Sequence, residues 1–251
     1  MRELIEIERF VHAGINRKRV DCHQVVRLTS AFTTYVSTFT NSKRFSGPST
    51  YFHSETIRIL RDTYQYDAAS AIRYDTFLDS LYATLACWGL HRMGKPTNQM
   101  VERECFVDTI RKQEDSIRKL QGKQIEGLSE EEVDDYGKAL WEIISKIKIA
   151  NNDARLVAGA KTLHHLLPFL LPPIDREYTL RCFFGKKNVT KGSTMFKQLF
   201  RCFYLIAQDS HEQIEMIMND SDSFNLMNTS YTKVIDNAVV GYVLTRDVSK
   251  R

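Results

Sequence analysis

Three prolines interrupt an apolar stretch in the C-terminal half of the chain and limit the conformations it can adopt. The stretch covers residues 156–184 and reads LVAGAKTLHHLLPFLLPPIDREYTLRCFF. Proline fixes φ, lacks a backbone N–H and disfavours helix in the residue before it, so residues 171–173 are predicted to be extended. Asp175 then stands at the start of a new helical pattern. Two interpretations of Asp175 are open: an N-cap, a position that Asp favours, or a carboxylate held at a rigid corner for chemistry.

The remainder of the chain predicts an all-α protein. Apolar residues recur at intervals of three and four, and no segment alternates convincingly with period two. Hydrophobic residues make up 43% of the 251 residues, which is enough for a substantial core, and no low-complexity linker divides the chain. A single all-α globular unit, residues 1–251, is therefore expected. Its helices are predicted over residues 3–15, 21–39, 55–64, 75–92, 98–123, 130–149, 154–167, 175–184, 194–207, 210–218 and 230–244.

Helix termini give two further expectations. Ser129 and Glu132 have the spacing of a capping box, which marks the start of the helix through residue 149. The segment FSGPSTYFH, residues 45–53, is predicted to be a loop with an aromatic tip, followed by a helix that Ser54 caps. A helix N-terminus at that place would favour a phosphate, whereas the alternative is that the two aromatic residues pack into the core as a hydrophobic staple.

Basic residues gather in three places. The formal net charge is only +4, but arginines and lysines cluster over residues 17–44, in the turn HRMGKP at residues 91–96, and in the loop GKKNVTKGS at residues 185–193. Such patches suit a polyanion, although a charged cluster is also the ordinary composition of a solvated surface. The lysine-rich loop lacks the spacing of a P-loop, so nucleotide hydrolysis has little support.

The cysteines and the apolar segments restrict the class of protein further. Five cysteines are widely spaced, without a CxxC pair, and are expected to be reduced and mostly buried. No set of histidine, cysteine and carboxylate residues has metal-ligand spacing, so neither a metal nor another cofactor is expected. The sequence shows no run long enough to cross a bilayer and no signal sequence, which predicts a cytoplasmic protein without a membrane partner.

One group of residues resembles a known family. Gly159-Ala160-Lys161-Thr162, followed by Pro173-Ile174-Asp175 and Arg181, is similar to the signature of the helix-hairpin-helix DNA glycosylases. The resemblance implies a fold of two helical lobes, here residues 1–150 and 151–251, with the active site in a cleft between them. It also implies an essential aspartate, Asp175, and a Schiff-base lysine, Lys161. The chain departs from the family at Val157, where the first hairpin glycine belongs, and in the short interval between the lysine and the aspartate.

The blocks SGPSTYFH, ACWGLHRMG and PPIDREYTLR together resemble a narrower group, the bacterial phage-defence glycosylases that excise glucosylated hydroxymethylcytosine. This resemblance implies a monomer that acts on double-stranded DNA. Because the target base must leave the stack, an aromatic pocket and basic edges are both required. The expected pocket residues are Tyr51, Phe52, Trp88, His91, Tyr178 and His164, and the expected DNA contacts are Arg92, Lys95, Arg176, Lys186, Lys187 and Lys191.

The alternative is a non-catalytic helical module that binds nucleic acid or a protein through its basic loops. The two functions differ in what they require of Asp175. A glycosylase needs the carboxylate to face an open cavity, whereas a binding module allows it to be used entirely as a helix cap.

Overall fold

The computed structural model describes residues 2–15, 20–42, 47–90, 99–151, 155–188, 190–219 and 227–248. Within these ranges the protein is all-α, as predicted, and the described residues form no strand beyond an isolated antiparallel bridge between Met100 and Ala150. The α-helices are α1 (Leu4–Val11), α2 (His23–Ser30), α3 (Phe32–Asn41), α4 (Pro48–Asp62), α5 (Ala68–Ala71), α6 (Asp75–Leu85), α7 (Arg103–Arg111), α8 (Glu114–Leu120), α9 (Glu130–Lys146), α10 (Arg155–Leu166), α11 (Arg181–Phe184), α12 (Gly192–Asp209), α13 (His211–Asn219) and α14 (Tyr231–Val248). Short π or 3-10 turns are η1 (Ala86–Leu90), η3 (Ile125–Gly127) and η4 (Arg176–Leu180).

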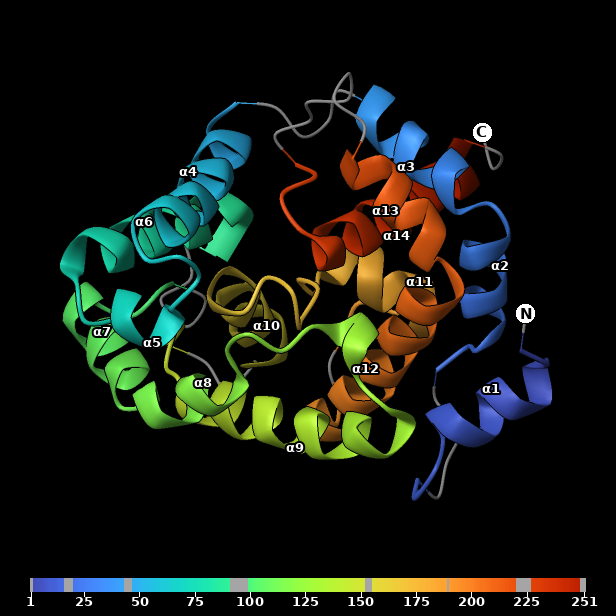
Figure 1. Cartoon of the computed structure of the whole chain (residues 1–251), viewed down its shortest axis with the longest axis horizontal. Helices are drawn as coiled ribbons and strands as arrows, with labels where there is room; N and C mark the ends of the chain where they lie inside the picture. The colour runs from blue at the N-terminus through green and yellow to red at the C-terminus, as the bar shows by residue number, and fades with distance from the viewer. Residues whose placement is uncertain are drawn as a thin grey trace.

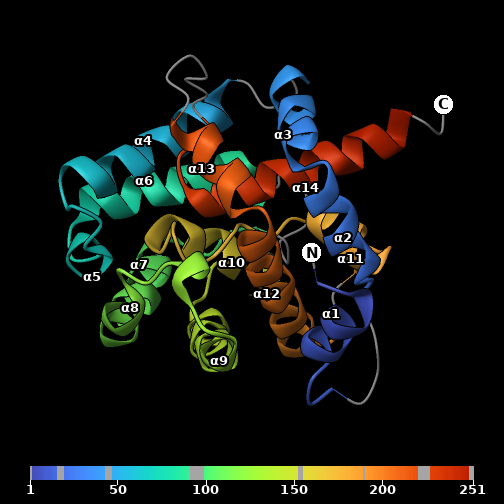
Figure 2. The same ribbon diagram turned by 45° about the vertical axis from the view of Figure 1, so that its right-hand side comes forward.

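The helices pack as pairs around a central element. Helices α4 and α6 lie side by side on one flank and α3 and α14 on the other, while α10 and α12 lie between them and α9 runs along the lower edge (Figure 1). Helix α14 crosses α3 and carries the chain toward the C-terminus (Figure 2). Helix α10 contacts α4, α6, α9 and α12, which explains why nearly its whole circumference is buried.

Two local predictions are confirmed. Helix α9 begins with the capping box, in which the Ser129 side chain accepts a hydrogen bond from the Glu132 backbone and the Glu132 side chain accepts one from the Ser129 backbone. Residues 171–175 form no helix, as the prolines require, and Asp175 is the N-cap of η4. The capping box and the extended segment 171–175, called the proline elbow from here on, each depend on residues only a few positions apart. The sequence alone is therefore sufficient to predict them.

Several predicted helix boundaries are wrong. The segment 21–39 is two helices, because Ala31 leaves the helical region with φ −142° and separates α2 from α3. The segment 98–123 is likewise divided into α7 and α8. The helix predicted for 75–92 has an α-helical part that ends at Leu85, and the π turn after it reverses at Gly89, where φ is +80°. Ser193 lies within α12 and does not cap it.

The predicted aromatic loop at residues 45–53 is also wrong for the part that is described. Gly47 adopts φ +83° and Pro48 occupies the first helical position, where its fixed φ suits a helix and its missing N–H costs nothing. Helix α4 therefore starts seven residues earlier than expected, and Tyr51, Phe52 and His53 belong to its first two turns.

The described helices include none that is both long enough and apolar enough to cross a membrane.

Candidate active site

Asp175 lies at the end of the proline elbow, and its two carboxylate oxygens have different partners. Oδ1 accepts a hydrogen bond from the Glu177 backbone N–H at 2.7 Å and so caps η4. Oδ2 accepts one from the Lys161 ammonium at 2.9 Å. The carboxylate is thus both a helix cap and one half of an ion pair, and the two interpretations of the sequence are compatible.

Lys161 lies on α10, a helix that is buried on nearly every side. Its side chain is 8% exposed, and its ammonium group also donates to the Trp88 carbonyl oxygen at 3.2 Å and lies 5.6 Å from the centre of the Trp88 ring. A buried ammonium requires such partners because removing a charge from water is costly. Burial by itself raises the pKa of the Asp175 carboxyl, but the Lys161 ammonium and the backbone N–H groups outweigh burial and hold that pKa below its ordinary value.

This ion pair lines a cavity of about 330 Å³. Residues from both ends of the chain form its wall, since α3, α4, η1, α10, the elbow and α14 all contribute. Its aromatic lining consists of Phe39, Trp88 and Tyr178. The Trp88 indole is fixed by a hydrogen bond from its ring N–H to the Ser49 carbonyl oxygen at 3.1 Å. A cavity with flat apolar walls and a few charged groups is the usual form of a small-molecule site.

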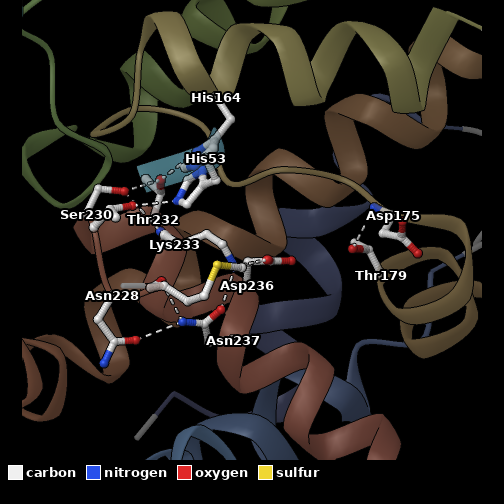
Figure 3. A network of polar contacts seen from close by, with 12 residues as sticks. His53, His164, Asp175, Thr179, Asn228, Ser230, Thr232, Lys233, Asp236 and Asn237 are labelled. Atoms are coloured by element: carbon white, nitrogen blue, oxygen red, sulfur yellow. Dashed lines mark hydrogen bonds and ion pairs between the residues drawn. The ribbon is translucent and has the colours of Figure 1, made fainter. Parts of the chain in front are cut away.

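A second ion pair lines the same cavity from α14. The Lys233 ammonium donates to Asp236 Oδ2 at 2.7 Å and to Asn237 Oδ1 at 2.5 Å. Figure 3 shows these three residues together on α14, with Asp175 on a separate segment. Burial raises the pKa of the Asp236 carboxyl, and the Lys233 ammonium offsets this effect only in part.

Three fully buried histidines lie behind the cavity. His53 Nδ1 is 3.0 Å from His165 Nε2, and His165 Nδ1 is 2.8 Å from the Lys161 carbonyl oxygen. Because a carbonyl oxygen only accepts, His165 must donate from Nδ1 and accept at Nε2, so His53 donates from Nδ1 and its Nε2 accepts from the Thr229 hydroxyl at 2.8 Å. His164 lies parallel to His53 and donates from Nδ1 to the Leu171 carbonyl oxygen at 2.9 Å. Burial lowers the pKa of each of these three rings and so favours the neutral form, for which the contacts above assign the tautomers.

The structure brings together only part of the predicted site. Asp175, Lys161, Trp88 and Tyr178 line the cavity. Of the other described candidates, Tyr51 is 62% exposed on α4, Phe52 is half-buried beside it and His164 lies in the histidine cluster. The positions that fall outside the described residues are His91, Arg92, Lys95 and the early basic residues Arg17, Lys18, Arg19, Lys43 and Arg44.

The predicted DNA contacts that are described lie on the surface around η4 and the loop before α12. Arg176, Lys186, Lys187 and Lys191 are all exposed. Lys187 forms an ion pair with Glu177 at 2.5 Å, so one member of the lysine-rich loop already has an acidic neighbour. Glu177 also supplies the backbone N–H that Asp175 accepts, which places this loop next to the elbow.

Sequence reasoning missed the contribution of α14. Lys233, Asp236 and Asn237 are spaced i, i+3 and i+4 on a helix that is otherwise largely apolar, so they share one face. The sequence pattern that could have identified these residues is the presence of charged side chains at this spacing inside an apolar segment.

No group of three or more histidine, cysteine or acidic residues able to hold a metal ion occurs among the described residues. The cysteines that the structure describes form no disulfide with one another, and three of them are buried.

Comparison of the chain with protein-family models, with curated proteins and with solved structures found no match in any of the three cases.

Proposed function

We propose that this protein is a DNA glycosylase that hydrolyses the N-glycosidic bond of a modified base and leaves an abasic site. One observation supports the proposal above the others: the Asp175 carboxylate lines an aromatic cavity while Lys161 holds its pKa below the ordinary value. A carboxylate that remains ionised next to apolar rings is suited to stabilising a cation.

The chemistry requires such a group. Breaking the bond between sugar carbon C1′ and the base nitrogen leaves positive charge on the sugar, which an ionised carboxylate stabilises. The Asp175 carboxylate can also accept a proton from the water that attacks C1′, while the base departs with the bonding electron pair and takes up a proton from solvent, so that the elements of one water are divided between sugar and base. The base has to leave the DNA stack to enter the cavity, where Trp88 and Tyr178 provide rings for stacking.

Lys161 acts as a positioning residue in this proposal. A Schiff-base nucleophile must attack as a neutral amine, whereas the Lys161 nitrogen donates hydrogen bonds to both Asp175 and the Trp88 carbonyl oxygen. The nitrogen is thus already committed to the ion pair with Asp175, and the proposal assigns it no bond to C1′. Water is then the nucleophile, and the product is an abasic site with an intact strand.

The candidate substrates differ mainly in size. A cavity of about 330 Å³ is near the lower end of the ~300–1,000 Å³ typical of small-molecule sites. One base with a compact substituent fits this volume. Glucosylated hydroxymethylcytosine, the base suggested by the resemblance to phage-defence glycosylases, is the largest of the candidate bases. Exposed Arg176, Lys186 and Lys191 would contact the phosphates of duplex DNA.

The test is a panel of duplex DNAs that contain uracil, methylated bases, hydroxymethylcytosine and its glucosylated form. We expect alkali-labile abasic sites from at least one member, and mass spectrometry of the released base identifies the substrate. Asp175→Asn keeps an N-cap side chain but removes the negative charge, so excision should fall by about 100-fold or more. Asp134→Asn is the matched control, because Asp134 on α9 pairs with Arg201 on α12 and neither residue lines the cavity. The absence of abasic sites across the whole panel would refute the proposal.

A non-catalytic nucleic-acid-binding module is the second candidate, and it is favoured by the exposed lysines next to the elbow. It predicts salt-dependent DNA binding that is unchanged in Asp175→Asn but weakened when Lys186 and Lys187 are replaced by alanine. Retention of DNA by a protein that excises nothing would favour this candidate.

A further inference from the structure

The ion pair on α14 is buried at the wall of the cavity. Lys233 and Asp236 have side chains that are 2% and 10% exposed, on a helix whose neighbouring residues are apolar. A buried ion pair is often no more stabilising than apolar residues of the same size, because both charges lose their hydration. Its position on the wall of the cavity indicates that the pair serves a ligand.

The contacts of this pair fix the orientation of the Asp236 carboxylate. The Asn237 amide donates to the Met227 carbonyl oxygen at 2.9 Å and to Asn228 Oδ1 at 2.8 Å, so its own oxygen must face Lys233. Lys233 then donates to Asp236 Oδ2 and lies 5.3 Å from the centre of the Phe39 ring. These contacts leave Lys233 with little surface and give it a single direction toward Asp236 (Figure 3).

One carboxylate oxygen remains for a ligand. Among the described residues, Lys233 supplies the hydrogen bond to Asp236 Oδ2, and Oδ1 has no hydrogen-bond partner. An ionised carboxylate only accepts hydrogen bonds. A ligand edge that meets Asp236 Oδ1 must therefore carry an N–H or O–H, whereas a carbonyl oxygen placed there would face a like partial charge and lose its hydration without compensation.

We propose that Asp236, oriented by Lys233 and Asn237, determines the specificity of this cavity by accepting a hydrogen bond from the exocyclic amino group of the bound base. A keto counterpart held in the same orientation places a carbonyl oxygen against the carboxylate, so the cavity selects amino-bearing bases, such as those of the cytosine type, over those of the uracil type. The inference rests on the proposed function in that the ligand is taken to be a base. Asp175 acts on the sugar and Asp236 on the base edge, so the two aspartates have separate roles.

The first experiment measures binding without catalysis. Tryptophan fluorescence reports on the cavity through Trp88, while Trp141, which packs against Phe196 on α12, gives a constant background. The probes are hydroxymethylcytosine and hydroxymethyluracil as free bases, which differ at the amino position and the adjoining ring nitrogen. We expect the wild-type protein to bind the cytosine compound about ten-fold more tightly or better, the discrimination typical of a matched hydrogen-bonding edge.

Variants then assign the preference to Asp236. Asp236→Asn can turn an amide N–H₂ toward the ligand and should abolish or reverse the preference, and Lys233→Met should weaken it because the carboxylate loses its orientation. Asp134→Asn should retain it. Thermal unfolding of each variant shows whether it is folded, and the wild-type comparison needs no variant. Equal binding of the two bases, tighter binding of the keto base, no saturable binding of either, or an unchanged preference in a folded Asp236→Asn would each overturn the inference.

A separate experiment tests the proposed function. It measures the release of base from DNA duplexes that carry hydroxymethylcytosine or hydroxymethyluracil. A protein that prefers the amino base through Asp236 but releases no base from DNA retains the inference and loses the glycosylase proposal. A protein that releases both bases at equal rates retains the glycosylase proposal and loses the inference.

Discussion

Asp175 shows how one carboxylate can serve the fold and the proposed reaction together. The oxygen that caps η4 fixes the rotation of the side chain, and the oxygen bound to Lys161 lies at the wall of the cavity. A carboxylate with both oxygens hydrogen-bonded needs no reorientation when charge develops next to it, which is the condition for efficient electrostatic stabilisation. The cap therefore contributes to the preorganisation of the site.

Removing Lys161 should change the pH dependence of base excision in a defined direction. The Lys161 ammonium lowers the pKa of the Asp175 carboxyl, so Lys161→Met should raise that pKa. If activity requires ionised Asp175, the pH below which the excision rate declines then moves to a higher value. Activity at alkaline pH is retained in part. Single-turnover excision measured against pH tests this shift.

The same variant separates positioning from covalent catalysis. Treatment of the wild-type reaction with borohydride should trap no protein–DNA adduct if water is the nucleophile. A trapped adduct that disappears in Lys161→Met, together with complete loss of excision at every pH, would show that Lys161 is the nucleophile.

At the scale of elements, the contact between α3 and α14 is unusually close. Gly241 on α14 faces the backbone of α3, and a Cβ atom at this position would lie 1.8 Å from the Tyr35 carbonyl oxygen. No side-chain rotation relieves a collision with backbone. This glycine sets the separation of the two helices that carry Phe39 and Asp236 into the cavity.

We expect Gly241→Ala to destabilise the protein strongly, at or above the upper end of the ~1–3 kcal/mol typical of overpacking. Gly137→Ala on α9 is the matched control, because its nearest neighbour would be Phe200 Cδ1 at 3.4 Å, an ordinary contact. Alanine there should be neutral or stabilising by up to about 1 kcal/mol, through its higher helix propensity. Denaturant unfolding of both variants gives the comparison. Equal free energies of unfolding would show that α3 and α14 are not in contact as described.

The lysine-rich loop between η4 and α12 gives a prediction about DNA affinity. Each lysine that neutralises a phosphate should contribute about 0.9 to the slope of log K against log salt concentration. Lys186→Ala and Lys191→Ala should each reduce the slope by about this amount. Lys187→Ala should reduce it less, because the ion pair between Lys187 and Glu177 must break before Lys187 can bind a phosphate. Lys138→Ala on α9, where Lys138 pairs with Asp135, is the control expected to leave the slope unchanged. A slope that is the same in all four variants would exclude the loop from the interface.

Local signals in the sequence were sufficient for the elements but not for the site as a whole. The capping box of α9 and the proline elbow depend on residues a few positions apart, so their patterns predicted them correctly. The start of α4 was misplaced because Ser54 is also a good cap, and local preference cannot rank it against Gly47-Pro48. Asp175 and Lys161 were predicted as candidates, but their partner pair on α14 lies more than fifty residues away, and only the packing of α14 against α3 and η4 brings it to the cavity.

At the scale of the whole molecule, the histidine cluster connects parts of the chain that are distant in sequence. His53 comes from α4, His164 and His165 from α10, and Thr229 from the segment that precedes α14. The order of donors fixed by the Lys161 carbonyl oxygen leaves one proton between His53 and His165. All three rings are fully buried, and burial disfavours the charged form of each. The three segments therefore pack around rings that must remain neutral.

This requirement predicts a loss of stability in mild acid. Burial lowers the pKa of His165 to about 4 and lowers the pKa values of His53 and His164 well below 6.5. The unfolded chain binds protons at these histidines near pH 6.5 while the folded protein does not, so the free energy of unfolding should fall as pH decreases from about 6.5 toward about 4. Each histidine that must remain neutral contributes a loss on the order of 2 kcal/mol by about pH 5. His165→Gln should reduce the dependence on pH, since glutamine does not titrate. Denaturant unfolding at several pH values between about 5 and 7, compared between the wild-type protein and His165→Gln, provides the measurement. A free energy of unfolding that stays constant over this range would mean that these histidines bind protons as readily in the folded protein as in the unfolded chain, and that burial does not keep them neutral.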